Sequence, residues 1–474
     1  MHRLSNKWFT PSALAAALLA SAHGAQATPQ YSVQRTGPLC AVAQDPASYN
    51  TKYLSFFESL VQGQGDWLFR TRYDLRTDFG TTPYGYSQFK RLRDALKARG
   101  VELMIVYQPT RGLVNREKLT PEEKAAFNFD LAKKNYLAAV EQFRKAGIWV
   151  TDLSPLFDEK GVDTDYYFKA DHHWTPAGAE RTAKLVAETL KQIPGFDDIP
   201  KKDFQSKVVG LLPKAGTLHK TAGQLCGTTY ATQYVDQYET EAAGDGGDSL
   251  FSDESDPKVA LVGTSNSGPA YNFAGFLQQH SGAEVLNMAV SGGGFDSALL
   301  QYMSSQEFHD NPPKVLIWEF ATHYDLAQQS FYRQAVPLVN NGCEGRPVAL
   351  KNRVKLKPGA NEVLVNGKEQ PLRDLRGRDY LVDLTFSDPA VHESKATIWY
   401  LNGRRENFKI EQSDRVDTGG RYVFELRNDQ DWADLNLLAL EIHSPEQMPK
   451  DLSVEVSVCK RPGAGGSNLA AQAD

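Results

Sequence analysis

Short apolar segments alternate with helix-forming segments over residues 49–320, and this alternation constrains the fold more than any other feature of the chain. Residues 101–107 form a continuous apolar run, as strands do when both faces of a sheet are buried. Strands that alternate with helices predict a mostly parallel sheet with helices on both sides, which is an α/β fold. We expect strands at 101–107, 148–153, 258–263, 285–289 and 315–320, helices at 84–99, 120–145 and 176–192, and a loop-rich passage before 258.

Three residues that follow predicted strands supply a carboxylate, an imidazole and a hydroxyl. Asp171 and His173 lie in a turn after the strand at 148–153, and Ser265 follows the strand at 258–263. Sites in parallel sheets lie beyond the carboxyl ends of the strands, so these side chains can meet. A serine hydroxyl attacks an ester when a histidine takes its proton, and an aspartate fixes the tautomer of that histidine. The sequence therefore predicts Ser265 as nucleophile, His173 as base and Asp171 as the acid that orients it.

Neighbouring residues offer alternatives at both positions. Ser267 is a rival nucleophile, and either serine could simply cap a helix, while the Ser265 N–H on a strand-to-helix turn could stabilise an oxyanion. His172 and His173 are not expected to point the same way, so one of them should be structural or face the substrate. Two histidines and an aspartate could bind a metal, but no second Asp and His cluster at ligand spacing exists in the sequence, so we expect neither a metal nor another cofactor. The glycine-rich loop at 287–294 either offers backbone donors to a ligand or is a plain tight turn.

The N-terminal segment has the pattern of a secretory signal peptide. Basic residues Arg3 and Lys7 precede an apolar run at 12–20, and Ala25-Gln26-Ala27 is a small-x-small cleavage site. The apolar run is too short for a membrane helix, and no later segment approaches the ~20 apolar residues that such a helix needs. We therefore predict that residues 1–27 are removed and that the mature protein is exported and soluble.

Four cysteines, Cys40, Cys226, Cys343 and Cys459, lie far apart in the sequence and form no C-x-x-C pair. This spacing favours two disulfide bonds in an oxidising compartment over a zinc or redox site. Four cysteines allow three pairings. Cys40 with Cys226 and Cys343 with Cys459 is the expected one, because it keeps each bond inside one predicted domain.

The composition changes near Gly342, where short alternating strands with frequent turn residues begin. These runs predict an all-β module, most simply a sandwich, and lie at 363–365, 380–386, 397–401 and 437–442. We therefore expect an α/β domain at 28–341 and a β-sandwich domain at 342–460. The acidic segment at 239–257 is expected to be a mobile loop, and the Gly- and Ala-rich tail at 461–474 to be disordered.

One predicted hairpin of the β module places basic and aromatic side chains on a common face. Side chains alternate along a strand, and a three-residue turn would put Phe408 opposite Ile398 in the core. The opposite side of this hairpin, which we call the cationic face, gathers Lys395, Thr397, Trp399, Arg405, Asn407 and Lys409.

The cationic face suits a carboxylated polysaccharide. A tryptophan offers a flat apolar platform to sugar rings, and cations bind uronate carboxylates. Residues 351–427 contain fifteen Lys and Arg and twelve Asp and Glu, so this region is basic in a chain of net charge -6. The alternative is an ordinary solvated strand face with Trp399 packed under a loop.

The order Asp171-x-His173-Trp174 before Gly263-Thr264-Ser265 resembles the acetyltransferase branch of the SGNH hydrolase-like superfamily, in which Asp and His precede Ser. Within this branch the chain is similar to the alginate O-acetyltransferases over essentially its whole mature length. The signal peptide, the segment at 65–69 and the C-terminal β module carry this second resemblance.

The resemblance implies that Ser265, His173 and Asp171 act as a triad, that Tyr271 and Tyr324 line the active-site groove, and that the β module binds carbohydrate. Thr264 stands where these hydrolases usually have Asp, and the usual Gly-x-Asn-Asp block is absent. The oxyanion donors other than the Ser265 N–H therefore stay open.

Added to these features, the resemblance implies a periplasmic enzyme that moves an acetyl group, through acetyl-Ser265, to a mannuronate hydroxyl of alginate. The alternatives are an acetyl esterase with the same triad and a non-catalytic polyuronate-binding scaffold of an export complex. The expected partners are a mannuronate-rich polyanion, an acetyl donor and other proteins of alginate export. The net charge of -6 disfavours nucleic acid.

Overall fold

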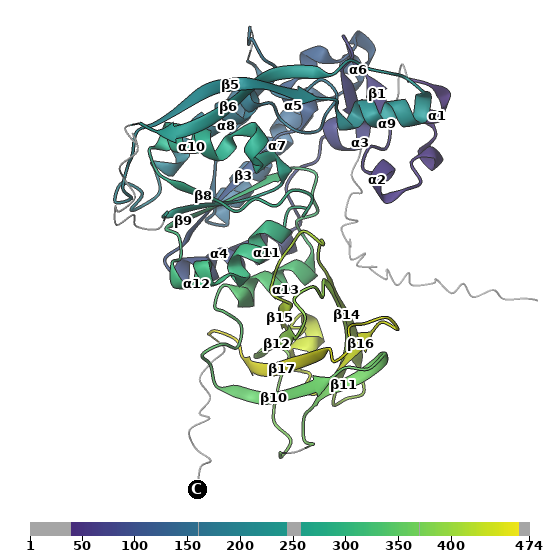
Figure 1. Ribbon diagram of the computed structural model, residues 1–474, viewed down its shortest axis with the longest axis vertical. Helices are drawn as coiled ribbons and strands as arrows, with labels where there is room; N and C mark the ends of the chain where they lie inside the picture. The colour runs from purple at the N-terminus through teal and green to yellow at the C-terminus, as the bar shows by residue number, and fades with distance from the viewer. Residues whose placement is uncertain (1–38, 160, 244–256, 369, 464–474) are drawn as a thin grey trace, which may run out of the picture.

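The computed structural model describes residues 39–159, 161–243, 257–368 and 370–463. Figure 1 shows an upper domain of helices and strands joined to a lower domain built almost entirely of strands. The predicted signal peptide lies outside the described residues, as do most of the predicted acidic loop and the end of the predicted tail. Within the described part of the chain, no helix is both long and apolar enough to cross a membrane.

Five parallel strands form the centre of the upper domain, as the alternation predicted. The sheet has the order β4-β3-β9-β7-β8, and every neighbouring pair is parallel. Except for Ala321 at the end of β9, the apolar side chains of β3, β7 and β9 are buried, which explains their continuous apolar sequence. The strands are β3 Glu102–Gln108, β4 Trp149–Val150, β7 Val259–Val262, β8 Val285–Asn287 and β9 Val315–Ala321.

Helices cover both faces of this sheet. Figure 1 shows α8 and α10 above it, and α4, α11 and α13 between the sheet and the lower domain. Thr82 caps α4 and Thr175 caps α8, and a proline follows each cap at the start of the helix. These helices are α4 Pro83–Ala98, α8 Pro176–Leu190, α10 Phe273–Ser281, α11 Ser297–Ser304 and α13 Gln329–Leu338.

The single helix expected at 120–145 was wrong, because two helices occupy this segment. They are α6 (Pro121–Ala126) and α7 (Phe129–Lys145). The Asn128 side chain accepts a hydrogen bond from the Leu131 N–H at 3.1 Å and so caps α7. Asn competes with the helical backbone for hydrogen bonds, which favours a new helix start over continuation.

The passage expected to be loop-rich contains two long antiparallel strands and a helix. β5 (Phe204–Lys214) pairs with β6 (Gln233–Ala242), and α9 (Thr217–Cys226) connects them. β6 therefore includes the first residues of the segment that we expected to be a mobile loop, whereas 244–256 lie outside the described residues. A disulfide bond joins Cys226, at the end of α9, to Cys40, as predicted, and fastens the N-terminal segment to α9.

The lower domain is a sandwich of two antiparallel sheets, as predicted. The sheets have the orders β10-β17-β12-β15 and β11-β16-β13-β14 and enclose an apolar core of their own. The predicted disulfide bond between Cys343 and Cys459 joins the start of this domain to its last strand. The strands are β10 Val348–Lys355, β11 Gly359–Val365, β12 Tyr380–Phe386, β13 Glu393–Tyr400, β14 Arg405–Glu411, β15 Arg421–Glu425, β16 Leu437–Ser444 and β17 Ser453–Lys460.

The hairpin of β13 and β14 has the predicted three-residue turn but a different register. The Tyr400 N–H donates to the Arg404 main-chain oxygen at 2.9 Å, and Phe408 pairs with Ala396, not with Ile398. The register differs by two residues, which preserves the alternation of faces. Phe408 therefore stays buried, and the cationic face keeps all its members.

Ion pairs connect the two domains. Arg91 of α4 contacts both carboxylate oxygens of Glu425 in β15, at 2.8 and 2.9 Å, and Arg333 of α13 lies 2.5 Å from Glu406 of β14.

Arg461, which we placed in the disordered tail, is buried, and its guanidinium lies 3.3 Å from Glu425. It also donates to main-chain oxygens of the sandwich. The ordered domain therefore extends beyond the boundary that we predicted at 460.

Candidate active site

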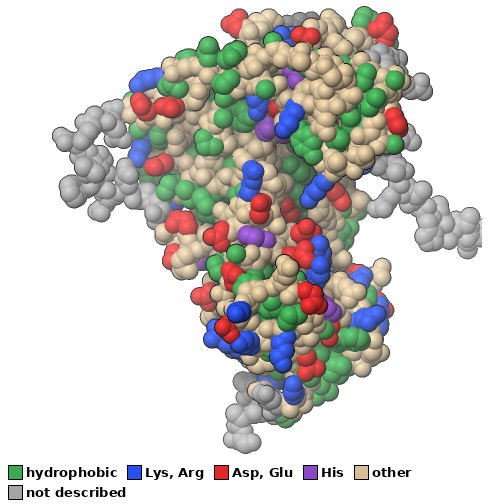
Figure 2. Space-filling model, turned by 45° about the vertical axis from the view of Figure 1, so that its right-hand side comes forward, with side chains coloured by type: hydrophobic (Ala, Val, Ile, Leu, Met, Phe, Trp, Pro, Cys, Tyr) green, Lys and Arg blue, Asp and Glu red, His purple; other side chains and the backbone are tan. Residues whose placement is uncertain are grey.

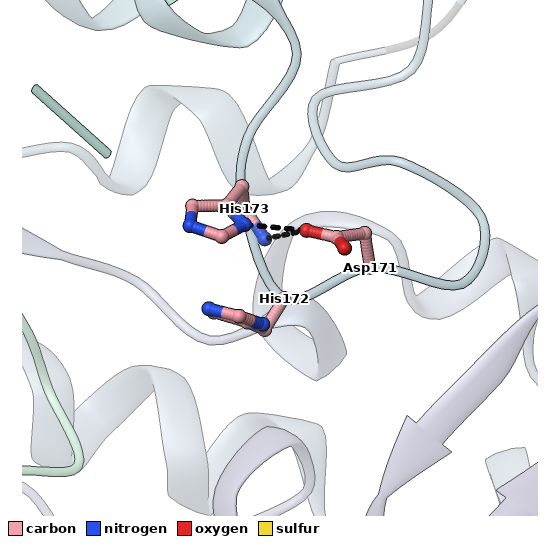
Figure 3. Close-up of side chains that lie close together, drawn as sticks. All are labelled: Asp171, His172 and His173. Carbon is pink, nitrogen blue, oxygen red and sulfur yellow. Dashed lines mark hydrogen bonds and ion pairs between the residues drawn. The ribbon is translucent and has the colours of Figure 1, made fainter. Parts of the chain in front are cut away.

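Asp171, His173 and Ser265 lie in one hydrogen-bonded row beyond the carboxyl end of β7. His173 Nδ1 lies 2.5 Å from Asp171 Oδ1, and His173 Nε2 lies 2.7 Å from Ser265 Oγ. The main-chain N–H of His173 also donates to Asp171 Oδ1 at 3.0 Å, so one carboxylate oxygen fixes both backbone and ring (Figure 3). The arrangement lets the imidazole take the proton of the serine hydroxyl.

Arg111 holds the turn that carries Asp171 and His173. Its guanidinium donates to four main-chain oxygens, those of Phe168 and Asp171 at 2.6 Å, Lys169 at 2.7 Å and Leu68 at 2.8 Å. The side chain is fully buried, and burial lowers the pKa of Arg111 to about 10, so the group stays charged at neutral pH. Sequence reasoning missed Arg111, because no local pattern shows that it reaches a turn sixty residues away.

The surroundings of Asp171 keep it ionised although it is only 1% exposed. Burial acts to raise the pKa of Asp171, but the hydrogen bond from His173 and the nearby charges, including Lys214, hold that pKa well below its ordinary value. Its second oxygen accepts the Thr217 N–H at 2.8 Å, and Lys214 Nζ lies 3.5 Å from the first. Both partners belong to the β5–α9 segment, which was expected to be loop-rich.

His173 is 8% exposed, and burial lowers its pKa below the ordinary 6.5. The hydrogen bond and charge of Asp171 oppose this shift, whereas the charge of Lys214 adds to it. The imidazole is therefore neutral at pH 7. Only the neutral ring can accept a proton from Ser265.

His172 lies against His173, contrary to the expectation that the two rings point apart. Their centroids are 3.9 Å apart, because the chain bends at His172 and His173 and both rings lie on one side of it (Figure 3). His172 Nδ1 is 2.9 Å from Thr217 Oγ1. Candidate ligand atoms of Asp171, His172 and His173 lie within 4.8 Å of one another and could in principle hold a cation. Hydrogen bonds already occupy both Asp171 oxygens, one nitrogen of His172 and both nitrogens of His173, so a metal would have to displace them.

The turn that carries Ser265 rests on the buried carboxyl group of Glu319 in β9. Glu319 accepts hydrogen bonds from the Thr264 N–H at 2.9 Å, from the Thr264 hydroxyl and from Ser267 Oγ at 3.0 Å. Burial raises the pKa of Glu319 to about 7, although the hydrogen bonds oppose the shift. Ser267 is fully buried and bonded to this carboxyl group, which argues against it as the nucleophile. Ser265 is only partly buried.

A small cavity of about 50 Å³ opens beside Ser265. Tyr324 lines it, together with Gln108, Arg70, His172 and His323, among others. Tyr271 is absent from this lining, and instead stacks on the His173 ring at 5.2 Å with its hydroxyl 2.6 Å from Lys214 Nζ. The structure thus brings both predicted tyrosines close to the row, in different positions.

The glycine-rich loop at 287–294 does not line this cavity. Asn287 Nδ2 donates to the Ser267 main-chain oxygen at 2.9 Å, and the Ser291 oxygen accepts from Arg415 of the lower domain at 3.2 Å. The loop therefore supports the serine turn from the side and contacts the β sandwich.

The cationic face is more balanced in charge than the sequence indicated. Lys395 lies 2.7 Å from Glu393, and Lys409 lies 3.2 Å from Glu393 and 2.7 Å from Glu411. Figure 2 likewise shows Lys and Arg interspersed with Asp and Glu on the lower domain. Trp399 is half-buried with the Arg405 guanidinium 5.5 Å from its ring, and Thr397 is buried, bonded to His443 at 2.9 Å.

Comparisons with known proteins match both domains. A model of the SGNH hydrolase-like domain of the acetyltransferase AlgX matches residues 60–322, and a model of a C-terminal carbohydrate-binding module matches residues 342–472. The alginate biosynthesis protein AlgX of Pseudomonas aeruginosa is 62% identical over 477 residues, which cover 99% of this chain and 100% of that protein.

More distant relatives and a solved structure agree with this match. The probable alginate O-acetylase AlgJ of Pseudomonas putida is 30% identical over 275 residues, covering 56% of this chain and 70% of that protein. A solved structure of Pseudomonas aeruginosa AlgX superposes with a TM-score of 0.84 at 64% identity, covering 90% of this chain and all of that one.

Proposed function

The chain belongs to the AlgX family of alginate biosynthesis proteins, with an SGNH hydrolase-like acetyltransferase domain and a carbohydrate-binding module, and we propose that it is a periplasmic O-acetyltransferase that acetylates mannuronate hydroxyls of alginate. The observation that carries the proposal is the unbroken row from Asp171 through His173 to Ser265, with contacts of 2.5 and 2.7 Å.

The first half-reaction forms an acetyl-serine. Ser265 Oγ attacks the carbonyl carbon of the acetyl donor while its proton passes to His173 Nε2, and the carbonyl electron pair moves onto the oxygen. The oxyanion then collapses, the bond to the donor breaks, and the departing group takes the proton from His173. Asp171 stabilises the imidazolium that forms in between.

The second half-reaction moves the acetyl group to the polymer. A mannuronate hydroxyl gives its proton to His173 and attacks the acetyl-serine carbonyl carbon, and collapse of the second oxyanion releases acetylated sugar and returns the proton to Ser265. Ser265 is only partly buried, which leaves room for a sugar hydroxyl to approach it. The cationic face, with Lys395, Trp399, Arg405 and Lys409, is proposed to hold the polyanion on the lower domain.

Two alternatives use the same residues differently. An esterase would pass the acetyl group to water, and a scaffold in an export complex would bind polymer without chemistry. The relative named a probable O-acetylase, AlgJ, matches 56% of this chain and supports the transferase.

The test incubates the mature protein with an activated acetyl ester and oligomannuronate and resolves the products by mass spectrometry. A transferase yields acetylated oligomannuronate with the wild type and none with S265A. An esterase yields only free acetate, and a scaffold gives the same products with S265A as with the wild type.

A further inference from the structure

The triad does not supply the hydrogen-bond donors that stabilise the oxyanion. Each half-reaction passes through an oxyanion, which needs two or more hydrogen-bond donors fixed in advance. Among the residues that the structure describes, the main-chain N–H of Ser265 has no hydrogen-bond acceptor and can supply one donor. The N–H groups of Thr264 and Asn266 cannot, because Glu319 and Thr264 Oγ1 already accept them at 2.9 and 3.2 Å.

Gln108 carries a donor without a partner at this place. It is the last residue of β3, it is 1% exposed, and it lines the cavity beside Ser265. Its Nε2 is buried and has no hydrogen-bond partner within the described part of the chain. A buried N–H group without an acceptor is costly, so such a group in a native site calls for a role.

A chain of hydrogen bonds fixes which end of the Gln108 amide is engaged and which end is free. The Trp174 main-chain N–H can only donate, and it points at Asn266 Oδ1, 3.4 Å away. Asn266 Nδ2 is thereby turned toward Gln108 and donates to its Oε1 at 2.9 Å. Gln108 Oε1 is thus engaged on the side of Asn266, the residue directly after Ser265, and Nε2 is left free.

We propose, resting on the function proposed above, that Gln108 Nε2 is the second oxyanion donor, acting with the Ser265 N–H. When the carbonyl electron pair moves onto oxygen, the Gln108 N–H donates a hydrogen bond to it, keeps its proton, and releases the oxygen when the carbonyl re-forms. Gln108 therefore contributes equally to formation and breakdown of the acetyl-serine.

The cavity agrees with this role in size. About 50 Å³ is room for a group of a few heavy atoms, since one water-sized sphere takes roughly 10–15 Å³. An acetyl group is of this size, and both Ser265 and Gln108 line the space. Arg70 also has an unpartnered nitrogen here, but its guanidinium is held by Asp74 at 2.7 Å and is not linked to the serine turn.

The test compares Q108E and Q108A with the wild type in hydrolysis of 4-nitrophenyl acetate. Q108E keeps an acceptor for Asn266, loses the donor and adds negative charge beside the oxyanion, so kcat should fall on the order of 10²–10³-fold with little change in KM. The lower limb of the pH profile, which reports His173, should not move in Q108A. The deficit of Q108E should shrink as pH falls, because the introduced carboxyl group can donate a hydrogen bond once it is protonated.

Two controls separate the possible failures. Q142E, on the exposed face of α7, should retain full kcat. If Q108E does not fold, Q108A alone is used for the test. If S265A still forms products, the proposed function itself fails. If S265A is inactive but folded Q108A and Q108E keep wild-type kcat, only the role of Gln108 is overturned. A loss of kcat in Q108A together with a displaced lower limb would likewise overturn it, because Gln108 would then act by positioning the triad.

Discussion

The indole N–H of Trp174 donates a hydrogen bond of 2.8 Å to the main-chain oxygen of Asn266. This bond joins the turn that carries the histidine to the turn that carries the serine, ninety-two residues further along the chain. We therefore expect the 2.7 Å contact between His173 and Ser265 to depend on this buried bond between their neighbours.

Changing Trp174 to Phe should loosen this coupling. The lost bond leaves a buried oxygen without its donor, which costs about 1–3 kcal/mol of stability. A displaced serine should lower kcat ~10–100-fold. W149F is the matched control, since Trp149 donates to Glu102 at 3.1 Å at the edge of the sheet, away from the site. Measured by thermal unfolding and ester hydrolysis, W149F should lose stability alone, and equal kcat for W174F and wild type would refute the coupling.

The pH dependence of kcat/KM should have its lower limb below pH 6.5. Burial lowers the pKa of His173, so the ring stays neutral, and active as a base, to a lower pH than an exposed histidine would. Activity is then lost as pH falls through this lowered pKa. Ester hydrolysis measured across the acidic range tests this, and a limb centred above 6.5 would contradict it.

Replacing Lys214 should move that limb upward. The ammonium group lies 3.5 Å from Asp171, and its charge lowers the pKa of His173. Its removal in K214M favours the imidazolium, so the pKa of His173 should rise and the limb should shift to higher pH. K220M, in which an exposed lysine of the same segment is changed, should leave the limb in place. A limb that stays in place, or that shifts downward, in K214M would contradict this effect of the Lys214 charge on His173.

Carboxylates on the cationic face should weaken its binding of oligomannuronate. Glu393 lies within 3.2 Å of both Lys395 and Lys409 and competes with a uronate for them. E393Q should tighten binding of oligomannuronate roughly two- to fivefold, as expected for exposed ion pairs. Calorimetric titration measures this. Combined K395E and K409E should weaken binding while ester hydrolysis stays intact, and loss of both activities together would count against separate roles for the two domains.

The sequence predicted the parallel sheet and the three residues of the row, because continuous apolar strands and a hydroxyl after a strand are local signals. It did not predict Arg111, Lys214, Glu319 or Gln108, whose partners at the site lie at least 43 residues away along the chain. Such contacts depend on which strand lies beside which. The pairing of β3 with β9 and of β9 with β7 brings Gln108 and Glu319 to the serine turn, and no local pattern encodes that order.

The register of the β13–β14 hairpin shows the same limit on a smaller scale. Alternation fixed which side chains share a face, so Lys395 and Lys409 were correctly placed together. It could not distinguish registers that differ by two residues, because both put Phe408 in the core. The acidic partner Glu393 on the same face follows from the alternation and was overlooked in favour of the cations.

The most direct test of the account is to trap the acetylated enzyme. The protein is mixed with 4-nitrophenyl acetate, quenched within one turnover, digested and mapped by mass spectrometry. We expect one acetyl group on the peptide that contains Ser265 in the wild type, accumulation of the same adduct when no acceptor is added, and no adduct in S265A. An acetyl group on another residue, or an S265A protein that still turns over the ester at the wild-type rate, would contradict the claim that Ser265 is the nucleophile.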